Sequence, residues 1–194
     1  HKKNISIIMG DVTDYNSFKS GINGIDIVFH LAALIAIPYS YRSPESYINT
    51  NVKGTYNILQ ACIDNEVKHL IHTSSSEVFG SAQIIPIDED HALNSQSPYA
   101  ATKIAADMLS ISFHKSFQVP VSILRPFNTY GPRQSSRAII PTLILQALTS
   151  DHISVGNLSP TRDLNYVSDT VNGFLSVAEN KSTVGQFINI GSGT

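Results

Sequence analysis

Short apolar runs alternate with helix-like segments along this chain, and this alternation restricts the fold more than any other feature of the sequence. The runs that resemble buried strands are 5–9, 26–30, 67–72 and 119–124. Between them, helices are expected at 14–22, 43–65 and 97–117. Strands that alternate with helices predict an α/β fold with a doubly wound parallel sheet and right-handed crossovers. Near-continuous apolar strands suit a sheet that is covered on both faces.

Beyond Arg125 the pattern changes, and a second, smaller part of the chain is expected. A turn-rich polar loop covers 127–134. It is followed by a predicted helix at 138–149, a short strand at 153–155, a helix at 168–179 and a last strand at 187–190. We therefore expect two parts, residues 1–125 and residues 126–194, and the second supplies a small lobe interleaved with the last sheet elements.

Length and composition exclude several classes of protein. With 194 residues, 14% charged and 42% hydrophobic, the chain can bury one sizeable core and is expected to be globular. The net charge of −2 gives no reason to expect a nucleic-acid partner, and the apolar runs are too short to span a membrane. The lone Cys62 excludes a disulfide framework and is expected to be buried and inert, and the seven histidines show no metal-ligand spacing. We expect a cytoplasmic protein.

Hydroxyl groups and a carboxylate follow the run at 67–72, where the sequence reads Thr73-Ser74-Ser75-Ser76-Glu77. Ligands of parallel α/β sheets bind beyond the carboxyl ends of the strands, so this cluster stands where a site is expected. Ser75, Ser76 and Glu77 are therefore candidate catalytic residues.

A phenol and an ammonium group follow on the helix expected at 97–117. Ser97-Pro98 marks its start, with Ser as the N-cap and Pro at the first helical position. Tyr99 and Lys103 are then four residues apart and lie on one face of the helix. A free phenol has a pKa of ~10, and a cation such as Lys103 would lower it toward that of a useful base. Tyr99 could then take a proton from an alcohol while hydride leaves the same carbon, with Ser75 sharing that proton.

Tyr15 and Lys19 repeat this spacing but are interpreted differently. No strand that ends in serines precedes them. We expect this pair to lie on a solvated helix surface and to have no catalytic role.

Several segments carry recognisable patterns: GDVTD at 10–14, HLAA at 30–33, TNVKGT at 50–55, TSSSEVFG at 73–80, YAATK at 99–103, RPFNTYGP at 125–132 and Arg162-Asp163. In this order and spacing they resemble the extended short-chain dehydrogenase/reductase family, in particular its nucleotide-sugar epimerases and 4,6-dehydratases. The runs at 37–41 and 160–165 look most like the NAD-dependent 4,6-dehydratases of legionaminic acid biosynthesis. The resemblance implies a partial Rossmann-like NAD-binding domain in 1–125 and a partial substrate-binding lobe in 126–194.

The resemblance also implies the cofactor, the substrate and the assembly. The residues implied to bind NAD are Asp11, Val12, Leu31, Ala32, Ala33, Asn51, Thr73, Tyr99, Lys103 and Pro126. A nucleotide-sugar is the implied substrate, contacted by Asn128, Arg137 and Arg162, and the fork of an arginine matches diphosphate oxygens. The alternative for Arg162 is an ion pair with Asp163. The two long helices are implied to form a homodimer through apolar positions that could equally belong to the core, such as Ile58, Leu59, Cys62, Leu109 and Phe113.

The sequence departs from the family pattern in two places. The Gly-rich phosphate-binding turn and the acidic residue after the second strand are missing, so we expect this chain by itself to bind NAD poorly. Ser76 stands where sugar dehydratases commonly carry an aspartic acid, so water or Glu77 would have to protonate the leaving hydroxyl.

Four functions stay open. The leading one is an NAD-dependent 4,6-dehydratase acting on UDP- or GDP-linked N-acetylglucosamine, in which Glu77 takes the C5 proton. A 4-epimerase shares the oxidation step but needs no carboxylate beside Ser75, and a nucleotide-uronic acid decarboxylase needs a cation for the C6 carboxylate. A non-catalytic sensor of NAD or nucleotide-sugar would not need Tyr99, Lys103 and Glu77 together. The structural alternative for Glu77 is that it caps the loop that ends at Gly80.

Overall fold

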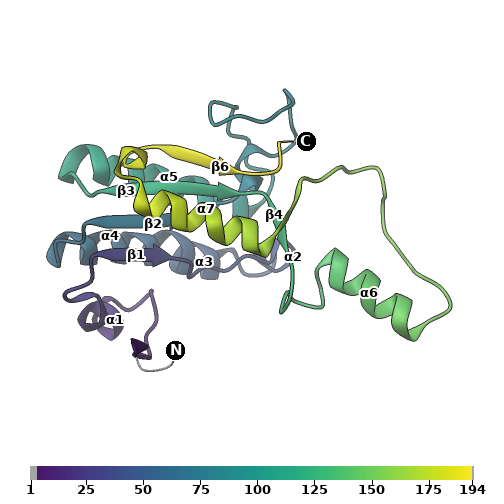
Figure 1. Ribbon diagram of the computed structural model, residues 1–194, viewed down its shortest axis with the longest axis horizontal. Coiled ribbons are helices and arrows are strands. Elements are labelled where there is room, and N and C mark those ends of the chain that lie inside the picture. The colour runs from purple at the N-terminus through teal and green to yellow at the C-terminus, as the bar shows by residue number, and fades with distance from the viewer. Residues whose placement is uncertain (1–3, 194) are drawn as a thin grey trace.

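Parallel strands form the central sheet of the computed structural model, which describes residues 4–193 (Figure 1). They are β1 (Ile27–His30), β2 (His69–Thr73), β3 (Val121–Pro126) and β6 (Phe187–Ile190), in the order β1-β2-β3-β6. Each neighbouring pair is parallel, with Val28 opposite Leu70 and Ile71 opposite Ser122. The expected parallel α/β fold is confirmed.

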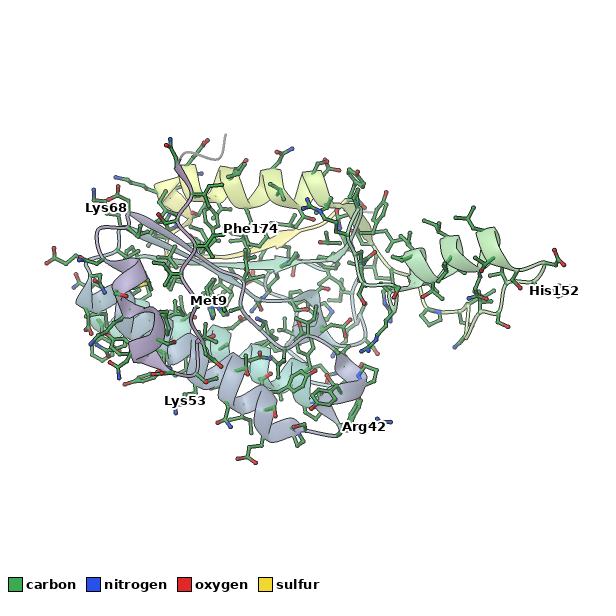
Figure 2. All side chains as sticks on the ribbon, turned by 90° about the horizontal axis from the view of Figure 1, so that it is seen from below. Met9, Arg42, Lys53, Lys68, His152 and Phe174 are labelled. Atoms are coloured by element: carbon green, nitrogen blue, oxygen red, sulfur yellow. The ribbon has the colours of Figure 1, made fainter. Side chains whose placement is uncertain are left out.

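Helices cover both faces of this sheet. The described α-helices are α1 (Tyr15–Ile22), α2 (Ile37–Ser40), α3 (Pro44–Tyr47), α4 (Gly54–Asp64), α5 (Pro98–Phe117), α6 (Ile139–Thr149) and α7 (Val167–Glu179), of which α6 lies away from the sheet. On one face, α4 and α5 bury a core that includes Leu59 and Leu70. On the other face, Phe174 points from α7 toward the sheet and packs in a core with Ile71 (Figure 2). Successive residues of β2 therefore face opposite layers, which explains why the strand is apolar on both sides.

Two of the helices begin where local sequence signals predicted. The Asp14 side chain accepts a hydrogen bond from the Asn16 amide (3.0 Å) and caps α1. The Ser97 side chain accepts one from the Ala100 amide (3.1 Å) and caps α5, with a proline at the first helical position.

The single helix expected over 43–65 contains a wider turn. Residues 44–47 and 54–64 are α-helical, but the segment between them, η2 (Ile48–Lys53), is a π-helix. Asn51 in this segment is buried, and its side chain bonds both the amide (2.8 Å) and the carbonyl (3.0 Å) of Leu34. Turns of this kind occur frequently at functional sites.

The part of the chain after β3 begins with an excursion from the sheet. Figure 1 shows α6 and the segment after it extending away from the other elements. The chain returns through β5 (Leu164–Tyr166), which pairs in parallel with β4 (Asn128–Tyr130), and α7 follows. The strand predicted at 153–155 is wrong, because the Gln146 side chain satisfies both backbone groups of Ser154 (2.7 and 3.2 Å) and holds the segment against α6.

The strand predicted at 5–9 is also wrong. These residues have no regular structure, and Ile7 and Met9 are each 88% exposed. Ile8 lies over α1, where it fills the space that a side chain at Gly21 would need. An apolar run becomes a strand only when a partner pairs with it, and within residues 4–193 β1 pairs with β2 alone.

Most of the apolar positions considered for a dimer belong to the core of the single chain. Ile58, Leu59, Cys62 and Phe113 are all buried in it, and Leu109 is partly buried against it. Cys62 is buried as predicted, and burial raises the pKa of its thiol to about 12. Among the described helices, none combines the length and the apolar character needed to cross a bilayer.

Candidate active site

The carboxyl ends of β1, β2 and β3 meet at one edge of the sheet, and the candidate site is built there. After Thr73, β2 gives way to a short 3-10 turn, η3 (Ser76–Phe79). Ser75 caps this turn, because its side-chain oxygen accepts a hydrogen bond from the Glu77 amide (3.2 Å). Ser76 and Glu77 are both half-buried. The three predicted catalytic residues of this segment therefore lie on one compact turn.

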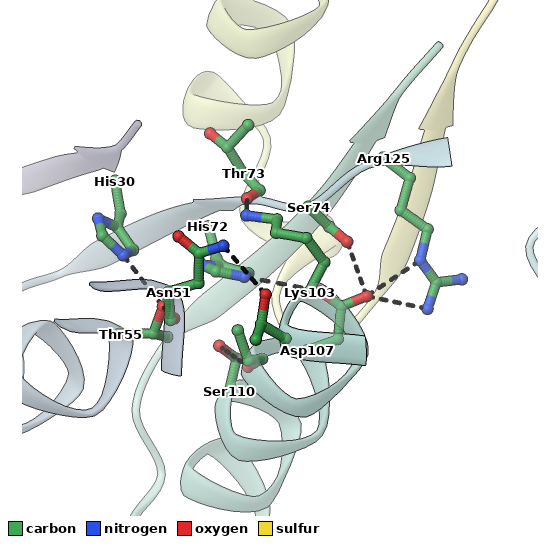
Figure 3. Close-up of polar contacts among 12 residues, drawn as sticks. His30, Asn51, Thr55, His72, Thr73, Ser74, Lys103, Asp107, Ser110 and Arg125 are labelled. Carbon is green, nitrogen blue, oxygen red and sulfur yellow. Dashed lines mark hydrogen bonds and ion pairs between the residues drawn. The ribbon is translucent and has the colours of Figure 1, made fainter. Parts of the chain in front are cut away.

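Helix α5 brings the phenol and the ammonium group to this turn. Tyr99 and Lys103 are one helical turn apart and are 6% and 4% exposed. Lys103 Nζ donates a hydrogen bond to the carbonyl of Thr73 (2.5 Å; Figure 3), which ties α5 to the end of β2. Ser75 hydrogen-bonds the phenol of Tyr99, and the Glu77 carboxylate lies close enough to act on its charge. The structure thus brings these four predicted catalytic residues together.

Burial raises the pKa of Tyr99 above its ordinary value. The hydrogen bond with Ser75 lowers that pKa, while the negative charge of Glu77 raises it further. The expectation of a lowered pKa is therefore wrong for the protein by itself, because desolvation has the largest effect and acts in the opposite direction. A positive group bound beside the phenol is needed to make Tyr99 a base near neutral pH.

Buried basic groups surround Lys103. Burial lowers the pKa of Lys103 to about 8, and the carboxylate of Asp107 opposes this shift. Burial also lowers the pKa of His30 and His72, whose rings lie 5.5 Å apart, so both are neutral at pH 7. His30 Nε2 lies 3.1 Å from Thr55 Oγ1. In the described part of the chain, no group of three or more His, Cys, Asp or Glu residues is placed to hold a metal ion.

Most residues implied to bind the cofactor lie along the same edge of the sheet. Residues 31–33 directly follow β1, Thr73 ends β2 and Pro126 ends β3. The hydroxyl of Thr73 is buried and has no hydrogen-bond partner among residues 4–193, so it is available to a bound group. Asn51 fixes the backbone of Leu34, just beyond the end of β1.

Asp11 and Val12 are placed differently. The Asp11 carboxylate accepts a hydrogen bond from the Thr13 amide (2.8 Å), and the Val12 carbonyl accepts one from the Asn57 side chain (2.7 Å). The Val12 side chain packs against Gly54, where an added Cβ would be only 2.8 Å away. The contacts of Val12 therefore run to α4, and the hydrogen bonds of Asp11 stay within residues 11–17. Neither residue is bonded to the loop after β1 among residues 4–193.

Arg137, one of the residues implied to bind substrate, lines a cavity of about 440 Å³ with residues 33–36, Tyr39 and Tyr47. Tyr47 packs edge-on against Tyr99, with 6.3 Å between the ring centres. One aromatic ring thus separates this cavity from the candidate base. A cavity with apolar walls and a single cation suits a small molecule with a polar group.

Asn128 and Arg162 come together through the pairing of β4 with β5. The Asn128 amide donates to the carbonyl of Asp163 (3.1 Å). The exposed Arg162 guanidinium donates to the carbonyl of Thr161 (2.7 Å), whereas the Asp163 carboxylate accepts from the amide and hydroxyl of Ser192 (2.8 Å each). Within residues 4–193, the alternative ion pair between Arg162 and Asp163 is not formed.

The buried charges beneath the site were not predicted from the sequence. Asp107 and Arg125 form an ion pair (3.2 Å) with side chains only 0% and 2% exposed, and the Ser74 hydroxyl donates to Asp107 (2.8 Å). The position of Asp107 on the helix could have indicated them. Asp107 follows Lys103 by four residues on the inward face of α5, where a carboxylate without a partner would be costly.

Tyr15 and Lys19 lie away from this site, on α1. Tyr15 is half-buried against the core and donates a hydrogen bond to Asp64, and Lys19 lies over its ring at 5.6 Å. The prediction of a solvated surface holds for Lys19 but is wrong for Tyr15.

Comparisons with known proteins give a consistent family. The sequence family described as GDP-mannose 4,6 dehydratase matches residues 1–193. A UDP-N-acetyl-alpha-D-glucosaminuronate decarboxylase of Bacillus cytotoxicus is 36% identical over 198 residues, which cover 97% of this chain and 61% of that protein. A dTDP-glucose 4,6-dehydratase from Streptomyces venezuelae, solved with NAD bound, has a TM-score of 0.89 at 29% identity and covers 95% of this chain and 57% of its own. A UDP-N-acetylglucosamine 4-epimerase from Methanobrevibacter ruminantium has a TM-score of 0.92 at 32% identity, and the match covers 99% of this chain and 63% of the epimerase chain.

These three relatives are named for three different reactions, and this chain spans between 57% and 63% of the length of each. The two solved structures share the fold of this chain, and the family match covers residues 1–193. The chain belongs to the GDP-mannose 4,6-dehydratase family, within the extended short-chain dehydrogenases/reductases.

Proposed function

We propose that the intact protein is an NAD-dependent nucleotide-sugar 4,6-dehydratase that acts on UDP- or GDP-linked N-acetylglucosamine. The observation that carries this proposal is the carboxylate of Glu77, which lies on the turn capped by Ser75, close enough to Tyr99 for its charge to raise the pKa of the phenol. This carboxylate makes no hydrogen bond or ion pair with any residue between 4 and 193.

The structural role considered for Glu77 does not use its side chain. The turn is closed by the Glu77 backbone carbonyl, which accepts a hydrogen bond from the Gly80 amide (3.3 Å). Glu77 is half-buried on the turn that carries Ser75, where a charge with neither a partner nor a task would be costly. Removal of a proton from the substrate would be such a task.

The residues present fit a bound dinucleotide. The unpartnered hydroxyl of Thr73, the small side chains of 32–33 and the ammonium of Lys103 all lie at the carboxyl edge of the sheet. Lys103 would hold the ribose next to the nicotinamide, and residues 31–33 would border the phosphates. When bound, NAD would supply the hydride acceptor for C4 of the sugar and the hydride donor for C6, so no external reductant would be consumed.

Side chains of the protein transfer the protons of the reaction. Tyr99, hydrogen-bonded to Ser75, takes the O4 proton as C4 is oxidised to the ketone. The ketone acidifies C5, and Glu77 removes the C5 proton. The hydroxyl then leaves C6 as water, protonated by Glu77 or by solvent, because Ser76 is too weak an acid. C5 finally regains a proton, and the net change is the loss of one water molecule.

The proposed substrate contacts involve two arginines, and no carboxylate of residues 4–193 forms an ion pair with either guanidinium group. Arg162 is exposed and bonds only a neighbouring carbonyl among residues 4–193, so its fork can engage diphosphate oxygens together with Asn128. Arg137 faces the cavity shared with Tyr39 and Tyr47, where a sugar substituent would fit.

A nucleotide-uronic acid decarboxylase is the second candidate. The 36% identity to such an enzyme favours it, and Arg137 supplies a cation that could meet a C6 carboxylate. A 4-epimerase removes no C5 proton and would not need the Glu77 carboxylate as a base. A non-catalytic sensor would not need Ser75, Tyr99 and Lys103 to be assembled in one site.

Replacement of Glu77 by glutamine tests the proposal. Glu77→Gln keeps the shape and removes the base, so the variant should oxidise C4 and accumulate the absorbance of reduced nicotinamide on the enzyme while no dehydrated product forms. Glu179→Gln is the matched control, because Glu179 is exposed at the end of α7, before the amino end of β6. Near-parental product formation by Glu77→Gln would contradict the role of Glu77.

A further inference from the structure

Asp107 extends the row of functional side chains on α5. It follows Lys103 by one helical turn, as Lys103 follows Tyr99, so the three share one face of the helix. Its side chain is completely buried. Asp107 is also the single buried carboxylate among residues 4–193.

The carboxylate of Asp107 binds the end of β2. Its Oδ2 accepts a hydrogen bond from the Ser74 hydroxyl (2.8 Å), and its Oδ1 lies 3.5 Å from His72 Nε2. Between these two residues, the Thr73 carbonyl accepts the bond from Lys103. Lys103 therefore holds Thr73 and Asp107 holds Ser74, while His72 lies beside the same carboxylate. The next residue in the chain, Ser75, is the one that hydrogen-bonds Tyr99.

Arg125 connects the same carboxylate to the far end of the catalytic turn. Its Nε and Nη2 each donate to Asp107 Oδ2 (3.2 Å). Its guanidinium lies 5.1 Å from the ring centre of Phe79, the last residue of η3, and 4.2 Å from that of Phe187. Its Nη1 also donates to the carbonyl of Glu89 (3.4 Å). Asp107 and Arg125 thus fix both ends of the turn that carries Ser75 and Glu77.

The charges around Lys103 make Asp107 important electrostatically as well. Lys103 faces Tyr99 and Asp107 on its own helix, His72 on β2 and His30 on β1, and both histidines are neutral at pH 7. Arg125 on β3 adds a second buried cation. The negative charge of Asp107 is the influence that raises the pKa of Lys103 against the effect of burial.

We infer that Asp107 is a positioning residue of the site: its buried carboxylate is the negative charge one helical turn from Lys103, and its bond to Ser74 holds the segment after β2 so that Ser75 meets Tyr99. This inference deepens the proposed function and rests on it for its catalytic consequence. Asp107 touches neither the proposed substrate nor the reacting atoms, so it acts through Lys103 and Ser75.

The test follows the titration of Lys103 in the intact protein by NMR of ¹³C-labelled lysine, with the Lys103 signal assigned from its loss in Lys103→Arg. Asp107→Asn should move the Lys103 midpoint to lower pH by roughly one unit or more, and Asp107→Glu should restore it toward the parental value. With the proposed substrate, kcat of Asp107→Asn should fall roughly 10- to 100-fold while KM stays near the parental value.

Asp107→Asn leaves Arg125 buried without its partner and could fail to fold. The double variant Asp107→Asn/Arg125→Gln removes both charges and should fold, and its Lys103 midpoint should again lie below the parental one. Asp64→Asn, at an exposed carboxylate on α4, should leave the midpoint unchanged. An unchanged midpoint in a folded Asp107 variant would overturn the inference. A shifted midpoint in a protein whose parent turns over no nucleotide-sugar would instead reject the proposed function.

Discussion

At the scale of single residues, burial sets the chemistry of this site. Tyr99 and Lys103 are both nearly inaccessible, and desolvation raises the pKa of the phenol and lowers that of the ammonium. Both shifts favour the uncharged forms: Tyr99 is a neutral phenol at pH 7, whereas Lys103, with a pKa of about 8, is still mostly an ammonium. A bound positive ring beside Tyr99 would change this balance, which links the activation of the base to cofactor binding.

The lowered pKa of Lys103 predicts a pH-dependent stability. Lys103 loses its proton near pH 8 in the folded protein but only near its ordinary value of 10.5 in the unfolded chain. Between these values the unfolded state binds more protons, so stability rises with pH across this window. The penalty present below pH 8 is about 3 kcal/mol.

Chemical denaturation of the intact protein between pH 7 and pH 10, without added cofactor, checks this expectation. Lys103→Met should have a higher free energy of unfolding than the parent at pH 7, and this difference should shrink as the pH rises. The same comparison with Lys115→Met, at an exposed position near the end of α5, should be flat. A flat profile for Lys103→Met would show that Lys103 titrates normally.

At the scale of elements, the start of α5 decides where Tyr99 and Lys103 stand. The Ser97 cap and Pro98 begin the helix directly before Tyr99, and the bond from Lys103 to Thr73 joins it to β2. The π-turn of η2 has a similar effect on Asn51, whose side chain also donates to Thr102 on α5 (3.0 Å). The site is therefore held by element ends rather than by long loops.

Removal of the α5 cap should lower stability by about 1 kcal/mol, because one helical amide loses its partner. Ser97→Ala in the intact protein should show this loss in denaturant unfolding, while Ser97→Asp should stay near the parent. Ser112→Ala, which removes an exposed hydroxyl in the middle of α5, is the control and should be nearly neutral. Equal stabilities for Ser97→Ala and the parent would mean that the cap does not define the helix start.

Local signals predicted the elements whose determinants are local. Asp14 and Ser97-Pro98 marked true helix starts, and the serines after β2 marked the true site. The strands predicted at 5–9 and 153–155 failed, because pairing depends on a partner far away in the sequence. The role of Asp107 was missed for the same reason, since Arg125 lies eighteen residues beyond it.

At the scale of the whole molecule, an assembly surface can be sought on the outer faces of α4 and α5. The apolar residues first considered are mostly core, but Tyr56 and Met108 on these helices are 44% and 40% exposed. We propose that the intact protein forms a homodimer through this surface. Light scattering should give a dimer mass for the parent, and Met108→Glu should shift it toward the monomer.

Leu175→Glu on α7, at a position 49% exposed on the opposite face of the sheet, is the matched control and should leave the mass unchanged. A monomer mass for the parent at micromolar concentration would reject the proposed dimer.

The reaction itself gives the most direct test of the central claim, that Glu77 serves a dehydration. The intact protein should be incubated with NAD and UDP- or GDP-N-acetylglucosamine in deuterated water, and the product examined by mass spectrometry and NMR. We predict a product lighter by one water molecule that carries solvent deuterium at C5. A product of unchanged mass, or a dehydrated product with no deuterium at C5, would contradict this account.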